Sequence, residues 1–194
     1  MQNVGAVILA AGGSSRFGSP KQLAQFRGKS LVQRVVAAAQ QAGCSPVVVV
    51  TGSNAAKVSS EATAPVVQNK HWREGIGSSI RVGVEYLSEL EPDVSAIVLL
   101  VCDQPLLDAG VIMNLRALHQ ETGKEIVASN YADTLGVPAL FARCVFRELL
   151  ELRGDSGAKK VILANRDRVA EFPFPGGNID IDTQADYENL TRET

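Results

Sequence analysis

The stretch from Val7 to Lys21 constrains this chain more than any other, because a short apolar segment runs directly into a glycine-rich loop. Residues 4–9 carry no charge, which favours a buried strand. Gly12 and Gly13 follow, and glycine tolerates positive φ and leaves backbone N–H groups accessible to an anion. Arg16 and Lys21 add the positive charges that a bound anion needs. The stretch predicts a loop for a phosphate-bearing ligand; the alternative is an ordinary glycine turn with a solvated cationic rim.

Two common phosphate-binding loops do not fit this stretch. The dinucleotide fingerprint G-x-G-x-x-G fails because the two glycines are adjacent. The P-loop pattern requires a glycine five positions before Gly28-Lys29-Ser30, and Leu23 stands there instead. Ser30 is better explained as the N-cap of the next helix, with Gln33 three residues later completing a capping box.

Composition excludes several classes of protein. The chain has 194 residues, of which 45% are hydrophobic and 21% charged, as expected for one globular domain with a substantial core. Its net charge of −2 provides no general attraction to nucleic acid, so positive potential for a phosphate must be local. Cys44, Cys102 and Cys144 are an odd number without a C-x-x-C pair, which predicts buried, reduced thiols and neither a disulfide framework nor a zinc site.

The amino-terminal segment resembles neither a signal peptide nor a membrane span. No basic region precedes its apolar run, and the glycine pair interrupts that run early. We therefore expect a cytoplasmic protein.

Strand-like and helix-like segments alternate through the first two thirds of the chain. Apolar runs predict strands at 47–50, 65–67, 96–101 and 125–128. Apolar residues at helical spacing predict helices after Ser30, from Ile76, and between an Asp108 cap and Gly123. This alternation indicates an α/β fold: a three-layer, Rossmann-like, mostly parallel sheet with helices on both faces.

The pattern is less regular after residue 130. We expect strands at 137–141, near Val169 and near Ile179, helices at 145–150 and 158–164, and a last helix that begins at a capping box in Thr183–Asp186. No linker, repeat or low-complexity segment is evident, so residues 1–194 are predicted to form a single domain.

Polar residues follow the predicted strands at the edge where ligands bind in parallel sheets. Asp103 directly follows the strand at 96–101, where it is suited to hold Mg²⁺ against triphosphate oxygens; an Asx-type turn before Pro105 is the structural alternative. Asp180 and Asp182 are two residues apart and share one face of an extended chain. Asp180 is our first choice for a second metal ligand and Asp182 the second; a polar strand edge is the alternative.

Other catalytic patterns are absent from the sequence. The segments around Ser14 and Ser79 lack the last glycine of a G-x-S-x-G nucleophile elbow. The two histidines, His71 and His119, do not form H-E-x-x-H, and we expect His119 on the surface of its helix. Hydrolase and zinc-enzyme functions are therefore disfavoured.

The run Leu9-Ala-Ala-Gly-Gly-Ser-Ser-Arg-Phe-Gly-Ser-Pro-Lys21 resembles the signature L-A-A-G-x-S-x-R-x-G-x-x-K. That signature belongs to nucleotidyltransferases similar to the enzymes that attach a nucleotide to molybdopterin. Further segments resemble the same family: W-x-x-G-x-x-x-S-I at 72–80, D-x-P-L at 103–106, G-x-P-x-L-F at 136–141, G-D-x-G-A at 154–158 and D-x-D-T at 180–183. The resemblance extends from Leu9 to the last helix.

The resemblance implies Mg²⁺-dependent transfer of a nucleotidyl group to an acceptor phosphate, with release of pyrophosphate. It implies a nucleotide-binding half at about 1–105 and an acceptor-binding half at about 106–194. The implied catalytic residues are Arg16, Lys21 and Asp103, and the implied metal ligands are Asp103 and Asp180. The implied nucleotide-binding residues are Leu9, Ala10, Ala11, Gly12, Gly13, Ser14, Arg16, Lys21, Asn69 and Ser79.

Some residues of these segments have simpler structural explanations. Ser78 or Ser79 would serve as an N-cap of the helix that follows, and Asp155 as an N-cap of the helix at 158–164. Lys159 and Lys160 are expected to be solvated, unless one of them meets the acceptor phosphate.

Within the family, molybdenum cofactor cytidylyltransferases, which join CMP from CTP to molybdopterin, match best. The choice of CTP rests on Leu-Ala-Ala-Gly at 9–12, where guanylyl-transferring relatives usually have Leu-Ala-Gly-Gly. Phe17 stands where methionine is common, and Cys102 where glycine commonly precedes the aspartate. Guanylyl transfer, transfer to a sugar or polyol phosphate, and a nucleotide-binding molybdenum cofactor chaperone without turnover remain alternatives, and a molybdoenzyme that receives the product is a possible partner.

Overall fold

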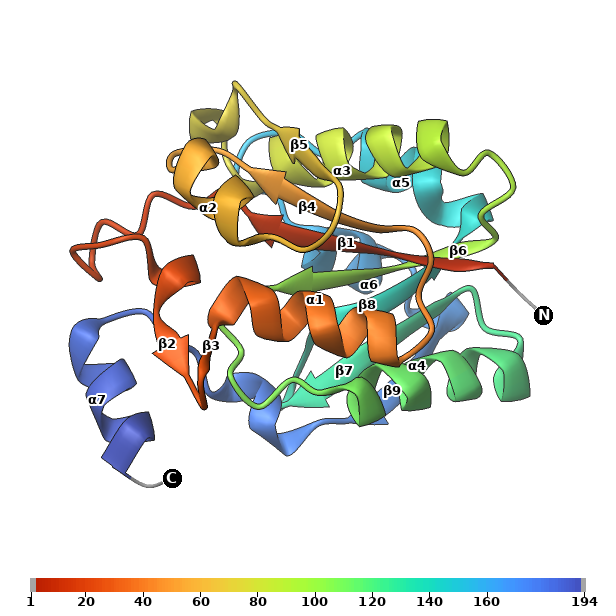
Figure 1. Cartoon of the computed structure of the whole chain (residues 1–194). Coiled ribbons are helices and arrows are strands. Elements are labelled where there is room, and N and C mark those ends of the chain that lie inside the picture. Colours follow the sequence, from red (N-terminus) through yellow and green to blue (C-terminus); the bar gives the residue numbers. More distant parts are fainter. Residues whose placement is uncertain (1–2, 193–194) are drawn as a thin grey trace.

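The computed structural model describes residues 3–192 and is built on a seven-stranded sheet with the strand order β5-β4-β1-β6-β8-β7-β9 (Figure 1). The strands are β1 Val4–Ala10, β4 Val47–Thr51, β5 Val66–Gln68, β6 Ala96–Val101, β7 Ile126–Tyr131, β8 Thr134–Ala142 and β9 Val169–Pro173. Only β8 is antiparallel to its neighbours, β6 and β7, among the strands of this sheet in the described residues. The mostly parallel sheet predicted from the sequence is confirmed.

Helices cover both faces of the sheet (Figure 1). They are α1 Leu31–Gln41, α2 Ala55–Glu61, α3 Ile76–Leu90, α4 Ala109–Thr122, α5 Phe146–Leu150, α6 Ala158–Ala164 and α7 Gln184–Arg192. Short 3₁₀ turns are η1 Lys21–Leu23, η2 Trp72–Glu74, η3 Arg143–Val145, η4 Arg166–Arg168 and η5 Pro175–Asn178. α7 lies away from the sheet (Figure 1), and none of its residues is buried.

The alternation of side chains along the strands creates two apolar cores, one on each face. In β4, Val47 and Val49 belong to the core beneath α1, α2 and α4, whereas Val48 and Val50 belong to the core beneath α3, α5 and α6. Successive side chains of a strand point to opposite faces, so an uninterrupted apolar run is required when both faces are covered. The three-layer architecture follows directly from these runs.

Strand order brings the carboxyl ends of β1 and β6 together. From β1 the chain continues outward through β4 to β5, and α3 then returns it to β6 on the other side of β1. In the resulting parallel pair, Leu9 lies opposite Val101. Such a reversal of direction opens a crevice at the carboxyl ends of the strands, where ligands bind in sheets of this kind.

The predicted helix caps are present. Ser30 and Gln33 form the capping box of α1. The carboxylate of Asp108 accepts a hydrogen bond from the Val111 N–H at 3.0 Å and caps α4, which ends at Gly123 with φ 65°. These local signals fixed the helix boundaries because each requires only neighbouring residues.

A small antiparallel hairpin was missed by the sequence analysis. β2 Gln25–Phe26 pairs with β3 Lys29–Ser30 across Arg27 and Gly28, which have φ values of 52° and 78°. Phe26 packs with other residues in a satellite core, which we define as Phe17, Phe26, Leu31, Ile181 and the partly buried Ala24, Tyr187 and Leu190. Packing in the satellite core holds α7 against the segment that follows the glycine loop.

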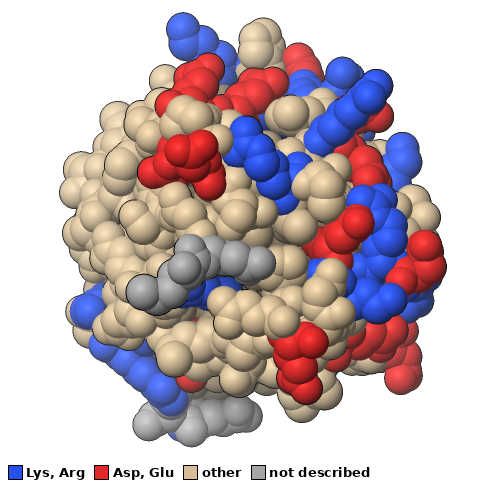
Figure 2. Space-filling model, turned by 90° about the vertical axis from the view of Figure 1, so that its right-hand side faces the viewer, with Lys and Arg blue, Asp and Glu red and all other residues tan. Residues whose placement is uncertain are grey.

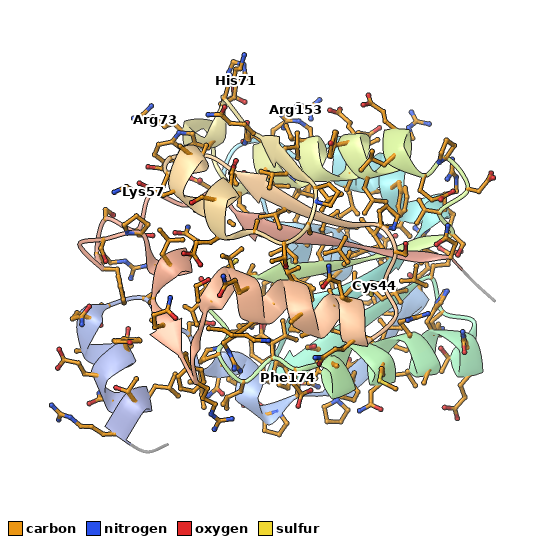
Figure 3. All side chains as sticks on the ribbon, viewed as in Figure 1. Cys44, Lys57, His71, Arg73, Arg153 and Phe174 are labelled. Atoms are coloured by element: carbon orange, nitrogen blue, oxygen red, sulfur yellow. The ribbon has the colours of Figure 1, made fainter. Side chains whose placement is uncertain are left out.

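Three expectations about strands and burial were wrong. No strand forms near Ile179, because the chain makes the η5 turn over Pro175-Gly-Gly-Asn178 and Ile179 is exposed. His119 is buried rather than on the surface, because its Nδ1 lies 2.7 Å from the Lys124 carbonyl oxygen, where the chain folds back after α4. Cys144 is exposed, whereas Cys44 (Figure 3) and Cys102 are buried as predicted.

Charge is distributed without a large single-sign region on the face at the amino end of β1. Figure 2 shows lysine and arginine side chains intermixed with aspartate and glutamate toward one side, and mostly uncharged residues toward the other. Across residues 3–192, no helix combines the length and the apolar character needed to cross a membrane.

Candidate functional site

A cavity of about 580 Å³ opens at the carboxyl ends of β1 and β6. It is lined by Leu9, Ala11, Gly12, Gly13, Lys21, Gln22, Trp72, Arg73, Gly75, Ile76, Ser79, Val101, Cys102, Asp103 and Asp155. The lining thus joins the glycine loop, the start of α3, the end of β6 and the turn before α6. This is the edge where the sequence analysis expected a ligand.

Gln22 organises the glycine loop from beneath and was missed by the sequence analysis. The buried carboxamide donates to the carbonyl oxygens of Ala10 at 3.2 Å and Gly12 at 3.0 Å. It also accepts a hydrogen bond from Ser14 Oγ at 3.3 Å. Ser14 Oγ in turn accepts from the Lys21 N–H at 3.1 Å. The loop is therefore closed by side chains of its own, which leaves residues 11–13 facing the cavity.

The ammonium group of Lys21 bridges two carboxylates. Its Nζ lies 2.8 Å from Asp103 Oδ2 and 2.9 Å from Asp182 Oδ1. Arg16 Nη2 lies 2.8 Å from Asp182 Oδ2, on a side chain that is 72% exposed. Residues that are 82 and 161 positions apart in the chain thus meet at one nitrogen atom. The sequence analysis had named Lys21 and Asp103 as catalytic residues and had placed Asp182 second to Asp180 as a metal ligand.

The charges of this cluster shift the pKa values of its members. Burial opposes the charged form of Lys21, but Asp103 and Asp182 outweigh it and raise the pKa of the ammonium group. Burial, reinforced by the negative charges of Asp103 and Asp182, raises the pKa of Asp180 to about 6. Hydrogen bonding to Lys21 is the main cause that lowers the pKa of Asp182. The cluster therefore concentrates negative charge around one lysine.

The donor set of the cluster fits a small divalent cation. Asp103, Asp180 and Asp182 offer only carboxylate oxygens, and a positive group, the Lys21 ammonium, already lies between two of them. Mg²⁺ usually takes one or two protein carboxylates and completes its octahedron with water and substrate phosphate. Among residues 3–192, no three or more His, Cys, Asp or Glu side chains come together in a group that could hold a metal ion by themselves. A cation held here would share its ligands with the substrate.

Ser79 lines the cavity and is held there by a buried asparagine. Asn69 Nδ2 donates to Ser78 Oγ at 2.8 Å and Ser79 Oγ at 3.0 Å, while its Oδ1 accepts from the His71 N–H at 2.9 Å. Asn69 is buried and does not line the cavity. The expected N-caps are wrong: Gly75, with φ 108°, is the N-cap of α3, and Ser78 and Ser79 lie inside the helix.

Trp72 forms a wall beside the glycine loop and was not singled out from the sequence. Its ring carbons lie 3.3 Å from the position that a Cβ on Gly13 would take, a contact so tight that the ring would have to move by a few tenths of an ångström to admit a side chain there. The Arg73 guanidinium lies 4.5 Å from the centre of the same ring, a cation–π contact. In Figure 3, His71 lies at the top of the molecule and Arg73 lies below it and to the left. Trp72 is the single tryptophan of the chain.

A second, mainly apolar cavity of about 180 Å³ adjoins the first. The two cavities share Leu9, Ile76 and Val101, and the second is further lined by Ile80, Tyr131, Thr134, Leu135, Gly136, Val137, Gly157, Ala158 and Lys159. Burial and the nearby charges of Asp180 and Asp103 raise the pKa of Tyr131, which links this cavity to the acidic cluster. Asp155 is not the N-cap of α6, since Gly157 takes that position; it lines the first cavity instead.

The cavity thus gathers most of the residues that the sequence analysis named. Leu9, Ala11, Gly12, Gly13, Lys21, Ser79 and Asp103 line it, whereas Ala10, Ser14, Arg16, Asn69 and Asp180 stand behind or beside it. Gln22, Trp72, Arg73 and Asp155 are the additions that needed the structure. The adjacency of Gln22 to Lys21 was the one sequence signal that pointed to it.

A family model described as the MobA-like NTP transferase domain matches residues 6–169. Nicotine blue oxidoreductase of Paenarthrobacter nicotinovorans is 33% identical over 121 residues, which cover 60% of this chain and 57% of that protein. Purine catabolism protein PucB of Bacillus subtilis is 28% identical over 200 residues, or 96% of this chain and 95% of PucB.

Solved structures extend the comparison. Rv0371c from Mycobacterium tuberculosis is 32% identical, covers 100% of both chains and superposes with a TM-score of 0.81. Rv0371c has also been solved in complex with manganese. Molybdopterin-guanine dinucleotide biosynthesis protein A from Archaeoglobus fulgidus shares the fold, with 19% identity, a TM-score of 0.68, and 97% and 99% of the two chains covered. The match of the family model and the full-length similarity to Rv0371c show that this chain belongs to the MobA-like NTP transferase family of nucleotidyltransferases.

Proposed function

We propose that this protein transfers CMP from CTP to the phosphate of a molybdopterin-type acceptor, with Mg²⁺ and with release of pyrophosphate, in the cytoplasm. The observation that carries the proposal is the position of Lys21 between the glycine loop and the carboxylates of Asp103 and Asp182. Nucleotidyl transfer needs this combination, because the protein has to align two phosphates and neutralise the charge that develops on the reacting one.

The glycine loop holds the triphosphate in this mechanism. Backbone N–H groups of residues 11–14 donate to its oxygens, and Gln22 keeps the loop open from below. Arg16 is exposed and bound only at its tip by Asp182, so it is free to turn toward the β- and γ-phosphates. Lys21 bridges toward the α-phosphate, where negative charge increases in the transition state.

Asp103 and Asp180 would hold the cation, and Asp182 lies close enough to assist. When bound, Mg²⁺ supplies charge neutralisation and orientation at the α-phosphate. The manganese in the Rv0371c structure supports a divalent metal dependence in this family. Asp182 has a second role in this mechanism. It forms ion pairs with Lys21 and Arg16, and it releases them when phosphate oxygens compete for the two cations.

Each substrate has its own cavity in this scheme. Ser79 and Ala11 face the nucleotide in the larger cavity, and the loop sequence Leu-Ala-Ala-Gly favours the cytosine base. The adjoining apolar cavity, with Tyr131 and Lys159 at its wall, accepts the acceptor body and directs its phosphate toward the acidic cluster. The shared fold with a molybdopterin-guanine dinucleotide biosynthesis protein supports an acceptor of this kind.

The test is a competition assay of the purified protein with Mg²⁺, molybdopterin and equal concentrations of CTP, GTP, ATP and UTP. We expect pyrophosphate release and a CMP-linked product. A preference for GTP would contradict transfer of CMP but would still support a nucleotidyltransferase. A panel of sugar and polyol phosphates tests the acceptor, and tight binding without turnover would identify a binding protein. Since one relative is named an oxidoreductase, a parallel assay for NADH or NADPH oxidation excludes or identifies a redox reaction.

A further inference from the structure

Gln104 follows Asp103 directly, and its side chain is buried rather than directed into either cavity. Its Nε2 donates two hydrogen bonds, to the Val137 carbonyl oxygen at 3.0 Å and to the Gly177 carbonyl oxygen at 2.9 Å. Among the described residues, its Oε1 is the only buried side-chain nitrogen or oxygen without a hydrogen-bond partner. Leaving a buried oxygen without a hydrogen bond costs about 1–3 kcal/mol of stability. The role of this side chain is therefore to be sought in the two hydrogen bonds that its nitrogen donates.

The first hydrogen bond provides a partner for a backbone carbonyl group in an irregular part of β8. Ala139 lies opposite Ala128 of β7, but the next pair is Gly136 with Ser129, so that Val137 and Pro138 are left outside this ladder. Side chains take over: Gln104 and Tyr131, the latter at 3.0 Å, donate to the Val137 carbonyl oxygen, and Ser129 Oγ donates to that of Pro138 at 2.6 Å. Three side chains thus support the bulge, and that of Gln104 also donates to Gly177.

The second bond fixes the segment that carries the acidic residues. This segment leaves the sheet at Phe174, which is labelled at the lower edge of the molecule in Figure 3, and continues through the η5 turn. Gln104 holds its Gly177 carbonyl, and the Ile181 N–H donates to the Asp103 carbonyl oxygen at 2.8 Å. Asp180 lies between these two attachment points, and Asp182 follows the second. Two successive residues, Asp103 and Gln104, therefore hold residues 177–181 at both ends.

We propose that Gln104 is a positioning residue that sets the spacing between Asp103 and the carboxylates of Asp180 and Asp182, and thereby the affinity for the divalent cation. The inference rests on the proposed function. The amide nitrogen of Gln104 carries two N–H donors and uses them to join the β8 bulge and the acidic segment to the residue beside Asp103. Groups that support metal ligands in this indirect way typically change metal affinity about 10–100-fold when they are removed.

The experiment compares Gln104→Met with Ser129→Ala. Gln104→Met keeps the size of the side chain and removes both donors. Ser129→Ala removes the hydrogen bond to the Pro138 carbonyl oxygen of the same bulge, a bond that involves no residue of 177–181. Mn²⁺ is the probe, and free Mn²⁺ is measured by electron paramagnetic resonance. We expect Gln104→Met to bind Mn²⁺ at least about 10-fold more weakly than the wild type, and Ser129→Ala to bind it within about 2-fold.

CTP binding in the presence of EDTA, followed by Trp72 fluorescence, provides a second readout. It should stay within about 2-fold of the wild type in both variants, because the glycine loop is untouched. Gln104→Asn, which keeps the amide and is one methylene shorter, should retain one of the two bonds and bind Mn²⁺ with intermediate affinity. It also replaces Gln104→Met in the comparison if the latter does not fold.

Wild-type Mn²⁺ affinity in folded Gln104→Met and Gln104→Asn would overturn the inference, and so would an equal loss in Ser129→Ala. If the wild-type protein binds Mn²⁺ and releases pyrophosphate while the variants match it, only the role of Gln104 fails. If the wild type does neither, the proposed function fails, and the inference fails with it.

Discussion

The two sides of the cavity are built in different ways. On one side, residues 11–21 form a loop whose backbone is held mainly by hydrogen bonds from within it or from Gln22, next in the chain, while the side chains of Arg16 and Lys21 reach Asp182 and Asp103. On the other side, residues 177–182 have few bonds of their own and are located by Asp103 and Gln104, 73 residues or more away in sequence. The structure of a loop held by local contacts can be predicted from a short stretch of sequence. A segment held by distant contacts is defined only once the sheet has formed.

Lys21 is where the two sides meet, so its removal tests both at once. We predict that Lys21→Ala and Asp103→Ala each lower the rate of pyrophosphate release by about 10²–10³, because a charged contact to the reacting phosphate or its cation is lost. Circular dichroism should show that both variants remain folded. The double variant should lose far less than the product of the two effects, since the residues act as a pair.

Lys57→Ala is the matched control for this prediction, because Lys57 is an exposed lysine of α2, outside the cavity (Figure 3). It should retain wild-type turnover. Wild-type turnover in Lys21→Ala would instead show that the two sides do not cooperate through this residue.

The loop side by itself is tested at Gln22. Gln22→Met keeps the apolar volume but leaves the carbonyl groups of Ala10 and Gly12 without their donor. We expect a loss of about 1–3 kcal/mol in the free energy of unfolding, measured by urea denaturation. CTP affinity should fall as well. Gln25→Met, at an exposed glutamine of β2, should change neither quantity, and the same result for Gln22→Met would mean that the loop does not depend on this side chain.

The other side, residues 177–182, is tested by measuring the stability of the protein at different pH values, with EDTA present. Burial and two neighbouring carboxylates raise the pKa of Asp180 to about 6 in the folded protein. The folded state therefore favours the protonated form; its stabilising contribution is present below about pH 4 and is lost as the pH rises through 6. Asp180→Asn should stabilise the protein by about 1 kcal/mol at pH 7.5, after allowance for solvent screening because part of this side chain remains exposed to water, and hardly at all at pH 4.

Thermal unfolding of Asp180→Asn at several pH values measures this difference. Asp93→Asn, at an exposed aspartate before β6, should show no such dependence on pH. A gain in Asp180→Asn that is equal at pH 4 and pH 7.5 would mean that the carboxylates do not repel one another.

Features held by local contacts were predicted correctly from the sequence, and features held by distant contacts were not. The strands of both cores, the caps at Ser30 and Asp108 and the rim position of Asp103 were predicted correctly, because each depends on periodicity or on near neighbours. The errors at Ile179, His119 and Asp155 share another cause. In each case a distant backbone, or a turn that propensity does not reveal, decided where the side chain lies.

By itself, the sequence determined the layered α/β fold, the glycine loop with its two cations, and the edge of the sheet at which they lie, since hydrophobic period and turn chemistry are properties of short stretches. Only the tertiary structure decided which carboxylates reach Lys21, that Gln22 supports the loop, that Trp72 forms its wall, and that Gln104 holds the acidic segment. The physical reason is that these contacts join residues far apart in the chain, and their geometry exists only after the strand order has brought β1 and β6 side by side.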